Sequence, residues 1–274
     1  MAENDLAPQS DLIVFADGPK DDRDRAKVAE VRQYLGGIEG FQRLEVIERQ
    51  ENLGLAGSII NGVTEVVNTY GRLIVLEDDL VTSPYFLRYM NEALVYYENQ
   101  DQVVSISGYI YPVAGLPETF FLLGADCWGW ATWQRGWGIF EADGQKLLDE
   151  LLQENLTERF DFNGAFAYTK MLREQIQGKN SSWAIRLYAS AFLARRLTLY
   201  PGRSLVHHIG GDGSGTHCGS TSRLDVQLAT RPVEVKEIPL EENTPAREKV
   251  KEFLATLKPA LLERIICLLK RAWG

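Results

Sequence analysis

Cysteine, histidine and methionine are scarce in this chain, with three of each among 274 residues. Cys127, Cys218 and Cys267 lie far apart, match no metal-ligand spacing and cannot build a disulfide framework. No apolar run approaches the roughly 20 residues of a membrane span. The N-terminus is polar and acidic and lacks the apolar core of a signal peptide. We therefore expect a soluble cytoplasmic protein.

Positive charge is also in deficit. The chain has 29 Lys and Arg residues against 38 Asp and Glu residues, for a net charge of −9, and no basic stripe. These numbers argue against a nucleic acid bound through its phosphates. A nucleotide held through a metal ion remains compatible with them, because the cation supplies the positive charge. The length allows one α/β domain or two small ones.

One stretch combines a short apolar run with a block of acids. Residues 73–76 read L-I-V-L, which is typical of a buried strand of a parallel sheet, and Glu77, Asp78 and Asp79 follow at once. Burying three adjacent carboxylates without a cation would be costly. The pattern favours a divalent-metal site at the carboxyl end of a strand, where ligands of α/β sheets collect. A solvated strand end ahead of a helix is the alternative.

Apolar strand patterns alternate with helical patterns over the first hundred residues. Strands are predicted at 12–15, 44–47, 72–76 and 103–106, with helices at 22–35, 59–67 and 84–97 between them. This order predicts a mostly parallel, Rossmann-like sheet flanked by helices. Three further helices are predicted at 144–154, 163–177 and 183–196, and a strand at 197–200.

Two loops have the composition of ligand-binding segments. Residues 50–58 are rich in Asn and Gly and precede a helix, so backbone N–H groups could approach a phosphate or a base, although an ordinary turn fits equally well. Residues 207–217 contain four glycines and all three histidines. Such a loop could close over a ligand, and His217 could reach a metal, although a surface histidine is the commoner case.

Tryptophan gathers in one place: four of the six lie between Trp128 and Trp137. Trp128, Trp130 and Trp133 cannot all face one core, so at least one is expected on a concave surface. Flat aromatic faces with polar edges suit sugar rings. A hydrophobic hinge packed under a loop is the alternative interpretation.

The C-terminal part differs from the rest of the chain in its pattern of apolar and polar residues. Residues 219–244 are predicted to be irregular and partly extended, and residues 245–273 to form one or two helices broken at Pro259. An apolar face beside basic residues in 259–273 fits an interfacial membrane helix, a helix docked on the domain, or a helix paired with a second subunit. We favour a helix docked on the domain. The next expectation is that the helix contacts the inner face of the membrane.

Six runs together resemble a known family. They are I-V-F-A-D-G-P-K (13–20), E-N-L-G-L-A-G-S (51–58), V-L-E-D-D-L-V-T-S-P-Y-F (75–86), C-W-G-W-A-T-W (127–133), S-W-A-I-R (182–186) and D-G-S-G-T-H (212–217). In order and spacing they resemble GT-A glycosyltransferases, within these a bacterial family-2-like group similar to eukaryotic N-acetylglucosaminyltransferase I. The likeness covers about residues 11–220. It implies a GT-A domain over 1–220, followed by an extended tail and amphipathic helix over 221–274.

The resemblance also implies a reaction and its cofactor. It implies transfer of a sugar, with inversion, from a nucleotide sugar (a UDP-sugar foremost) to a glycan or lipid-linked acceptor, with Mn²⁺ or Mg²⁺. The resemblance assigns Asp79, with Asp78, to the metal, and Asp17, Asn52 and Asp78 to the donor. The residue patterns add His217 for the metal and Trp128, Trp130 and Trp183 for the substrates. Asp126 and Asp212 are the remaining candidates for the catalytic base.

Two departures from the family pattern keep other functions open. The family has one more strand ahead of the strand at 12–15, and here that strand is expected to be missing. The family also has an acidic pair before a Trp, where this chain has Ser181 and Ser182 ahead of Trp183. A weakened nucleotide-sugar-binding or scaffold protein is therefore the alternative. A nucleotidyltransferase would need a glycine- and lysine-rich loop near the start, which the sequence lacks.

Overall fold

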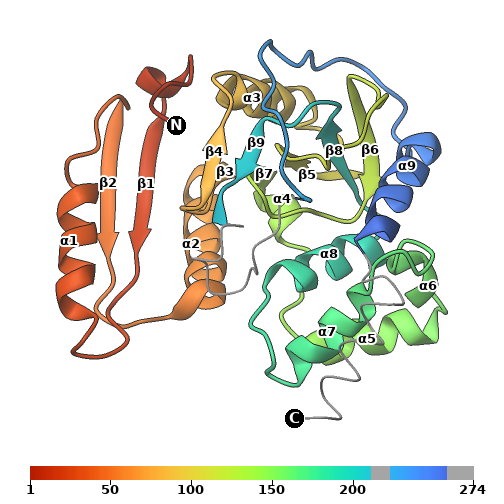
Figure 1. Ribbon diagram of the computed structural model, residues 1–274, viewed down its shortest axis with the longest axis horizontal. Helices are drawn as coiled ribbons and strands as arrows, with labels where there is room; N and C mark the ends of the chain where they lie inside the picture. The colour runs from red at the N-terminus through yellow and green to blue at the C-terminus, as the bar shows by residue number, and fades with distance from the viewer. Residues whose placement is uncertain (211–222, 258–274) are drawn as a thin grey trace.

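The computed structural model describes residues 1–210 and 223–257 (Figure 1). In chain order the elements are a 3-10 helix η1 (Ala7–Gln9), β1 (Asp11–Ala16), α1 (Arg25–Leu35), β2 (Arg43–Glu48), α2 (Gly54–Tyr70), β3 (Arg72–Val75), β4 (Leu80–Thr82), α3 (Phe86–Tyr96), β5 (Val103–Ser107), β6 (Thr119–Leu123), β7 (Trp130–Trp133), α4 (Gln134–Trp137), α5 (Gly144–Gln153), α6 (Thr157–Phe160), α7 (Tyr168–Ile176), α8 (Ala184–Leu193), β8 (Leu197–Pro201), β9 (Val206–His208) and α9 (Thr244–Thr256).

The fold is α/β, as predicted, but the main sheet is mixed. Its strand order is β3-β7-β5-β8-β6. Only β5 and β8 pair in parallel, while the other three pairings are antiparallel. The prediction of a mostly parallel sheet is therefore wrong. The strands β3 and β5 do share a direction, but β7 runs between them in the opposite sense, and its four residues belong to the tryptophan-rich run.

The first two strands form a separate small sheet. β1 and β2 pair in parallel along their full lengths, and no described strand bonds to the other edge of β1. The side chains of Leu12 to Phe15 are only half-buried, whereas β5 is buried throughout. Figure 1 shows this pair set apart from the main sheet. The helix α2 reaches both parts, since its Gly62 faces the Phe15 ring and it packs along β3.

The strand β3 is correspondingly an edge strand. It pairs with β7 on one side only, and Leu73 and Ile74 are half-buried. The sequence predicted a fully buried strand of a parallel sheet here, which is wrong because no described strand covers its outer edge. The carboxyl ends of β3 and β5 nevertheless lie close together, since Trp130 pairs with both Val75 and Ser107.

The remaining helices and the tail cover the main sheet. The helices α5, α7 and α8 pack on one another and fill one end of the molecule (Figure 1). The described tail, 223–243, contains no helix or strand, and Ala229 and Val233 are buried in the same core as α3. The helix α9 buries Val250 and Leu254 in the core of α5 and α8. The segment 259–273 lies outside the described residues.

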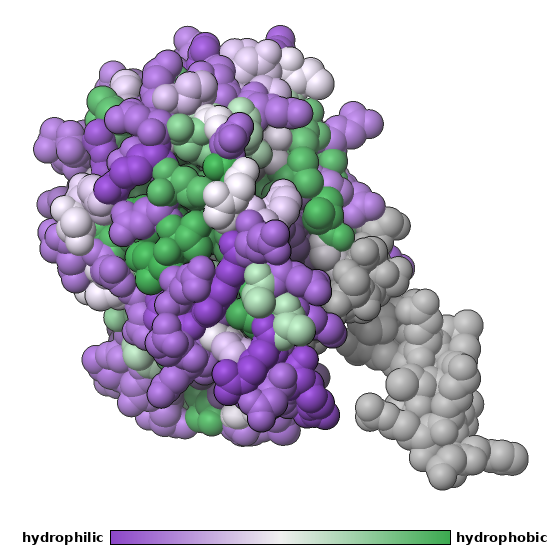
Figure 2. Space-filling view, turned by 90° about the vertical axis from the view of Figure 1, so that its left-hand side faces the viewer, coloured by the Kyte–Doolittle hydropathy of each residue, from purple (hydrophilic) through white to green (hydrophobic). Residues whose placement is uncertain are grey.

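One flank of the surface is mainly polar and exposes a few apolar side chains (Figure 2). Figure 2 shows a mainly hydrophilic flank interrupted by apolar residues. On the outer helix α1, Val31 and Tyr34 are 55% and 75% exposed. Within residues 1–210 and 223–257, no helix is long and apolar enough to cross a membrane.

Candidate functional site

The acidic block lies in the turn between β3 and β4, and one of its members contacts a histidine. The Oδ2 atom of Asp79 is 2.9 Å from Nε2 of His208. The imidazole is 11% exposed, while the Asp79 side chain is 38% exposed and open to a ligand. A half-exposed carboxylate beside a nearly buried imidazole provides one oxygen and one nitrogen donor at the same point.

Strand pairing fixes this contact. β4 and β9 form an antiparallel pair in which Leu80 faces His208, and the N–H of Ile209 donates to the carbonyl of Asp79 at 2.8 Å. The backbone also passes close to the two side chains. A Cβ atom added at Gly210 would lie 2.8 Å from Asp79 Oδ2 and 3.1 Å from His208 Cε1, so the glycine leaves the room that both side chains need.

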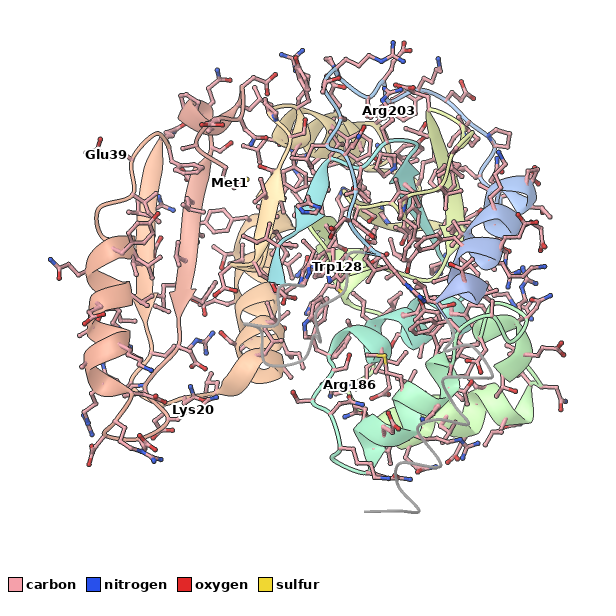
Figure 3. The ribbon with its side chains drawn as sticks, viewed as in Figure 1. Met1, Lys20, Glu39, Trp128, Arg186 and Arg203 are labelled. Atoms are coloured by element: carbon pink, nitrogen blue, oxygen red, sulfur yellow. The ribbon has the colours of Figure 1, made fainter. Side chains whose placement is uncertain are left out.

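Trp128 forms the wall of the site on the far side of the histidine. Its ring stacks on His208, with centroids 4.5 Å apart and planes 9° apart, and meets the Tyr109 ring edge-on at 4.6 Å. Figure 3 shows Trp128 near the middle of the molecule. The N–H of Gly108, just after β5, donates to the carbonyl of Gly129 at 2.7 Å. The tryptophan is thereby held at the carboxyl ends of β3 and β5.

Asp126 lies in the loop that carries this tryptophan. Its Oδ1 atom accepts the N–H of Cys127 at 2.7 Å, and the N–H of Trp128 lies near enough to the carboxylate to act on its pKa. Burial raises the pKa of Asp126, and these two N–H groups oppose that rise. The Asp126 charge in turn contributes to the raised pKa of Tyr109. The predicted catalytic residue is thus close to the site, but bonded to its own backbone.

Glu77 is the half-buried member of the acidic block whose pKa is shifted. Burial first, and then the charges of Asp79 and Asp78, raise its pKa to about 7, while a hydrogen bond from the Trp183 side chain acts in the opposite sense. Asp78 is exposed. The three acids therefore divide into a half-buried carboxyl with a pKa of about 7, an exposed carboxylate, and the carboxylate that contacts His208.

The other predicted tryptophans are core residues. Trp130 is 1% exposed and Trp183 is 2% exposed, and their rings stack at 5.5 Å in the core beside α2. Neither presents a face to a ligand in this structure, because both faces are packed. Trp183 nevertheless reaches the site from within through its bond to Glu77. Of the three predicted substrate-binding tryptophans, only Trp128 lines the surface.

The predicted base-binding residues bond to backbone groups where the end of β1 meets the start of α2. The two carboxylate oxygens of Asp17 accept the N–H groups of Leu53 and Gly54, both at 2.9 Å, at the start of α2. The Nδ2 atom of Asn52 donates to the carbonyl of Gly18 at 2.8 Å. Asp17 and Asn52 thus tie the end of β1 to the start of α2. Among the described residues, no hydrogen bond or ion pair joins them to the acidic block.

The donor set can be tested against a metal ion. Neighbouring ligands of an octahedral ion, with bonds of about 2.1 Å, lie about 3 Å apart, which is close to the 2.9 Å between Asp79 and His208. The imidazole favours a transition ion such as Mn²⁺ over Mg²⁺, which prefers oxygen. Among the described residues, no group of three or more His, Cys, Asp or Glu could hold a metal. The 2.9 Å separation is also that of a hydrogen bond, so an ion held by this pair would replace the shared proton and take its other ligands from substrate and water.

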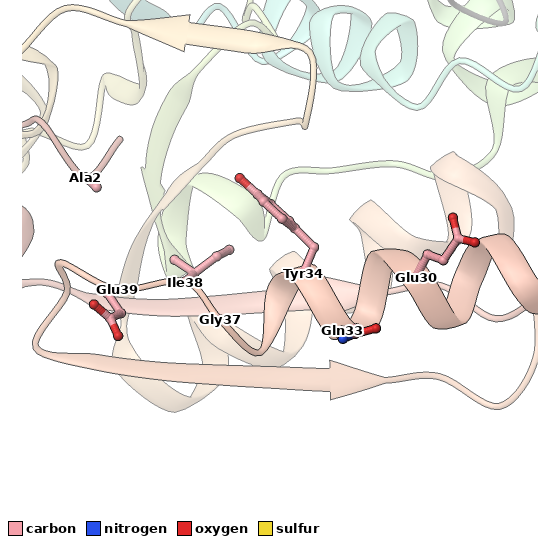
Figure 4. Close-up of a pocket in the computed structure, with 7 residues that line it drawn as sticks. All are labelled: Ala2, Glu30, Gln33, Tyr34, Gly37, Ile38 and Glu39. Atoms are coloured by element: carbon pink, nitrogen blue, oxygen red, sulfur yellow. The ribbon is translucent and has the colours of Figure 1, made fainter.

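The sequence predictions missed His208 as a site residue and named His217 instead. His217 and Asp212 lie outside the described residues, so these two predictions stay as they were. The available signal for His208 was the short apolar run Leu205-Val206 ahead of the two histidines. Val206 and both histidines form β9. A separate shallow pocket lies at the end of α1 and contains none of the predicted site residues (Figure 4); it is lined by Ala2, Glu30, Gln33, Tyr34, Gly37, Ile38 and Glu39.

Comparison with known proteins adds no family assignment. No protein-family model matches this chain, and no curated protein sequence matches it.

Proposed function

We propose that this protein is a metal-dependent, inverting glycosyltransferase that moves a sugar from a nucleotide sugar to an acceptor hydroxyl. The observation that carries the proposal is the contact of Asp79 with His208 at the carboxyl end of β3, beside Asp78 and under the ring of Trp128. The order of the six sequence runs supports a UDP-sugar as donor and a glycan or lipid-linked acceptor.

The chemistry assigns separate tasks to these residues. Asp79 and His208 would hold Mn²⁺, and the exposed Asp78 would face the donor. When bound, the ion would offset the charge that develops on the leaving diphosphate. The acceptor oxygen forms the new bond to the anomeric carbon as the bond to the phosphate oxygen breaks, and the hydroxyl proton passes to a base. Trp128 supplies the flat apolar edge against which a sugar ring packs.

A second candidate function rests on different observations. No strand of residues 1–210 and 223–257 pairs with the edge of β1 beside the predicted base site. The hydroxyl of Ser182, at the position of the family's acidic pair, accepts the N–H of Ile185 at 3.2 Å. A protein with these features could bind a nucleotide sugar without transferring it. Both functions share the cation, so metal binding supports either, and turnover separates them.

One experiment tests the proposal and ranks the two functions. Calorimetry with Mn²⁺ and UDP-sugars measures binding, and release of UDP with and without sugar acceptors measures turnover. We expect Mn²⁺-dependent UDP release that is lost in Asp79→Ala. Binding without UDP release on any acceptor would favour the second function. Unchanged metal binding and turnover in Asp79→Ala would rule out the site.

A further inference from the structure

We infer that Asp126 is a positioning residue, which sets Trp128 against His208, rather than the proton acceptor. The inference starts from the local geometry of the loop between β6 and β7. The Oδ1 atom accepts the N–H of Cys127 at 2.7 Å, and the N–H of Trp128 lies near enough to the carboxylate to lower its pKa. This is the arrangement of an Asx turn, in which a side-chain oxygen replaces a backbone carbonyl and closes the chain on itself.

The loop is fixed on both sides of that turn. Gly124 and Gly129 have φ values of +99° and +63°. A Cβ atom would lie 2.2 Å from the Tyr188 ring at Gly124 and 2.6 Å from the Val206 side chain at Gly129. Close packing at both ends leaves little room around the turn, and the Trp128 ring lies flat on His208.

The histidine needs such a support. Its Nε2 atom reaches Asp79, and the ring is otherwise held by its stack on Trp128. Groups that orient a metal ligand from outside the ligand set commonly contribute about 10- to 100-fold in metal affinity. The chain of contacts is therefore Asp126 to the Trp128 backbone, the Trp128 ring to His208, and His208 to Asp79. This role rests on the proposed function only where it concerns the cation.

The choice between Asn and Ala at position 126 separates the two roles. Asp126→Asn keeps an oxygen that accepts the same backbone N–H groups, as Asn does in Asx turns, but it cannot take a proton at neutral pH. Asp126→Ala removes both functions. Asp143→Ala is the matched control, because Asp143 makes the same kind of bonds, to Gln145 N at 2.9 Å and Lys146 N at 3.2 Å, at the start of α5.

Two measurements read the result without an acceptor substrate. Electron paramagnetic resonance of free Mn²⁺ gives metal affinity, and hydrogen exchange of the peptide 124–130 gives protection of the turn. We expect Asp126→Ala to weaken Mn²⁺ binding by about tenfold and to lose protection, and Asp126→Asn and Asp143→Ala to stay within about twofold of the unaltered protein in Mn²⁺ affinity. Trp128→Leu should weaken Mn²⁺ binding while the turn stays protected, which keeps the test valid if Asp126→Ala does not fold.

Two outcomes would overturn the inference. One is native Mn²⁺ affinity and native protection in Asp126→Ala. The other is a loss in Asp126→Asn equal to that in Asp126→Ala, which would mean that the charge of Asp126, and not its acceptor oxygens, supports the metal site. If the unaltered protein binds no Mn²⁺, the proposed function loses its cation, while the exchange comparison of the two variants still decides whether Asp126 holds the turn.

Discussion

His208 contacts Asp79 through strands from distant parts of the chain, because β4 and β9 pair directly beside both residues. The neighbouring His207 lies on the same strand and accepts only a long bond, 3.4 Å, from the N–H of Val226. These two histidines therefore form a matched pair for testing the site. His208 contacts Asp79 of the acidic block, and His207 contacts Val226 of the tail.

Replacement of His208 by Ala should weaken Mn²⁺ binding at least tenfold, since one of the two protein donors is lost. Replacement of His207 by Ala should change Mn²⁺ affinity less than twofold. Calorimetric titration of both variants checks the expectation. Equal effects of the two substitutions would mean that the metal does not bind between Asp79 and His208.

The stability of the metal-free protein should depend on the charge of Glu77. Its folded-state pKa is about 7 against an ordinary 4.5, so the folded protein holds this proton more tightly than the unfolded chain does. The contribution of Glu77 is therefore largest below pH 4.5 and is lost as pH rises to about 7. Each pKa unit corresponds to about 1.4 kcal/mol of unfolding free energy.

Urea unfolding at a series of pH values, with Glu77→Gln as the control, isolates this effect. We expect the unfolding free energy of the unaltered protein, relative to that of Glu77→Gln, to fall between pH 4.5 and 7 and to level off above pH 7. A constant difference between the two proteins over this range would contradict the assignment. Saturating Mn²⁺ should weaken the dependence, because the cation offsets the repulsion among the three acids.

The carboxylate of Asp17 should contribute to folding through its bonds to Leu53 and Gly54. Asp17→Ala should lower the unfolding free energy by about 1 kcal/mol, which is typical for the loss of a side chain that caps a helix. Asp17→Asn keeps one acceptor oxygen and should cost less. Denaturant melts give both values, and UDP titration of the same variants tests whether Asp17 also contacts the base. A stability loss with unchanged UDP affinity would limit Asp17 to its structural role.

A methyl group at Gly129 should disturb both stability and the tryptophan wall. The residue has φ +63°, and the new Cβ would lie 2.6 Å from the Val206 side chain. Gly164 is the matched control, because it has φ +76° but no atom within 4 Å of a built Cβ. We expect about 1 kcal/mol of destabilisation for Gly164→Ala from backbone strain, and about 2 kcal/mol more for Gly129→Ala from crowding. Similar melts for both variants would show that Val206 moves aside freely.

The sequence predicted the local elements better than their assembly. The strands at 11–16, 43–48 and 103–107 and the helices α2, α3 and α5 lie where apolar spacing indicated them. The antiparallel position of β7 between β3 and β5 could not be predicted. Its four residues lie within a tryptophan-rich run, which has no periodicity of apolar and polar residues.

The site was predicted unevenly for the same reason. The acidic block and Trp128 stand out locally, as a charge cluster and as part of a rare composition. The partner of Asp79 depends on pairing between two three-residue strands, which is a long-range fact with no local signal. Burial likewise decides which tryptophans line the surface, and the spacing of Trp128, Trp130 and Trp183 along the chain does not determine it.

Among the described strands, β1 pairs with β2 alone, and this affects how the protein unfolds. β1, α1 and β2 make few contacts outside their own group, and α1 has no buried residue. The β5–β8 region, by contrast, is buried throughout. Amides of residues 11–48 should therefore exchange through a subglobal opening of lower free energy than the global transition of the main sheet. The segment that carries Asp17 would then unfold and refold as a unit, while Asp79 and His208 keep their folded positions.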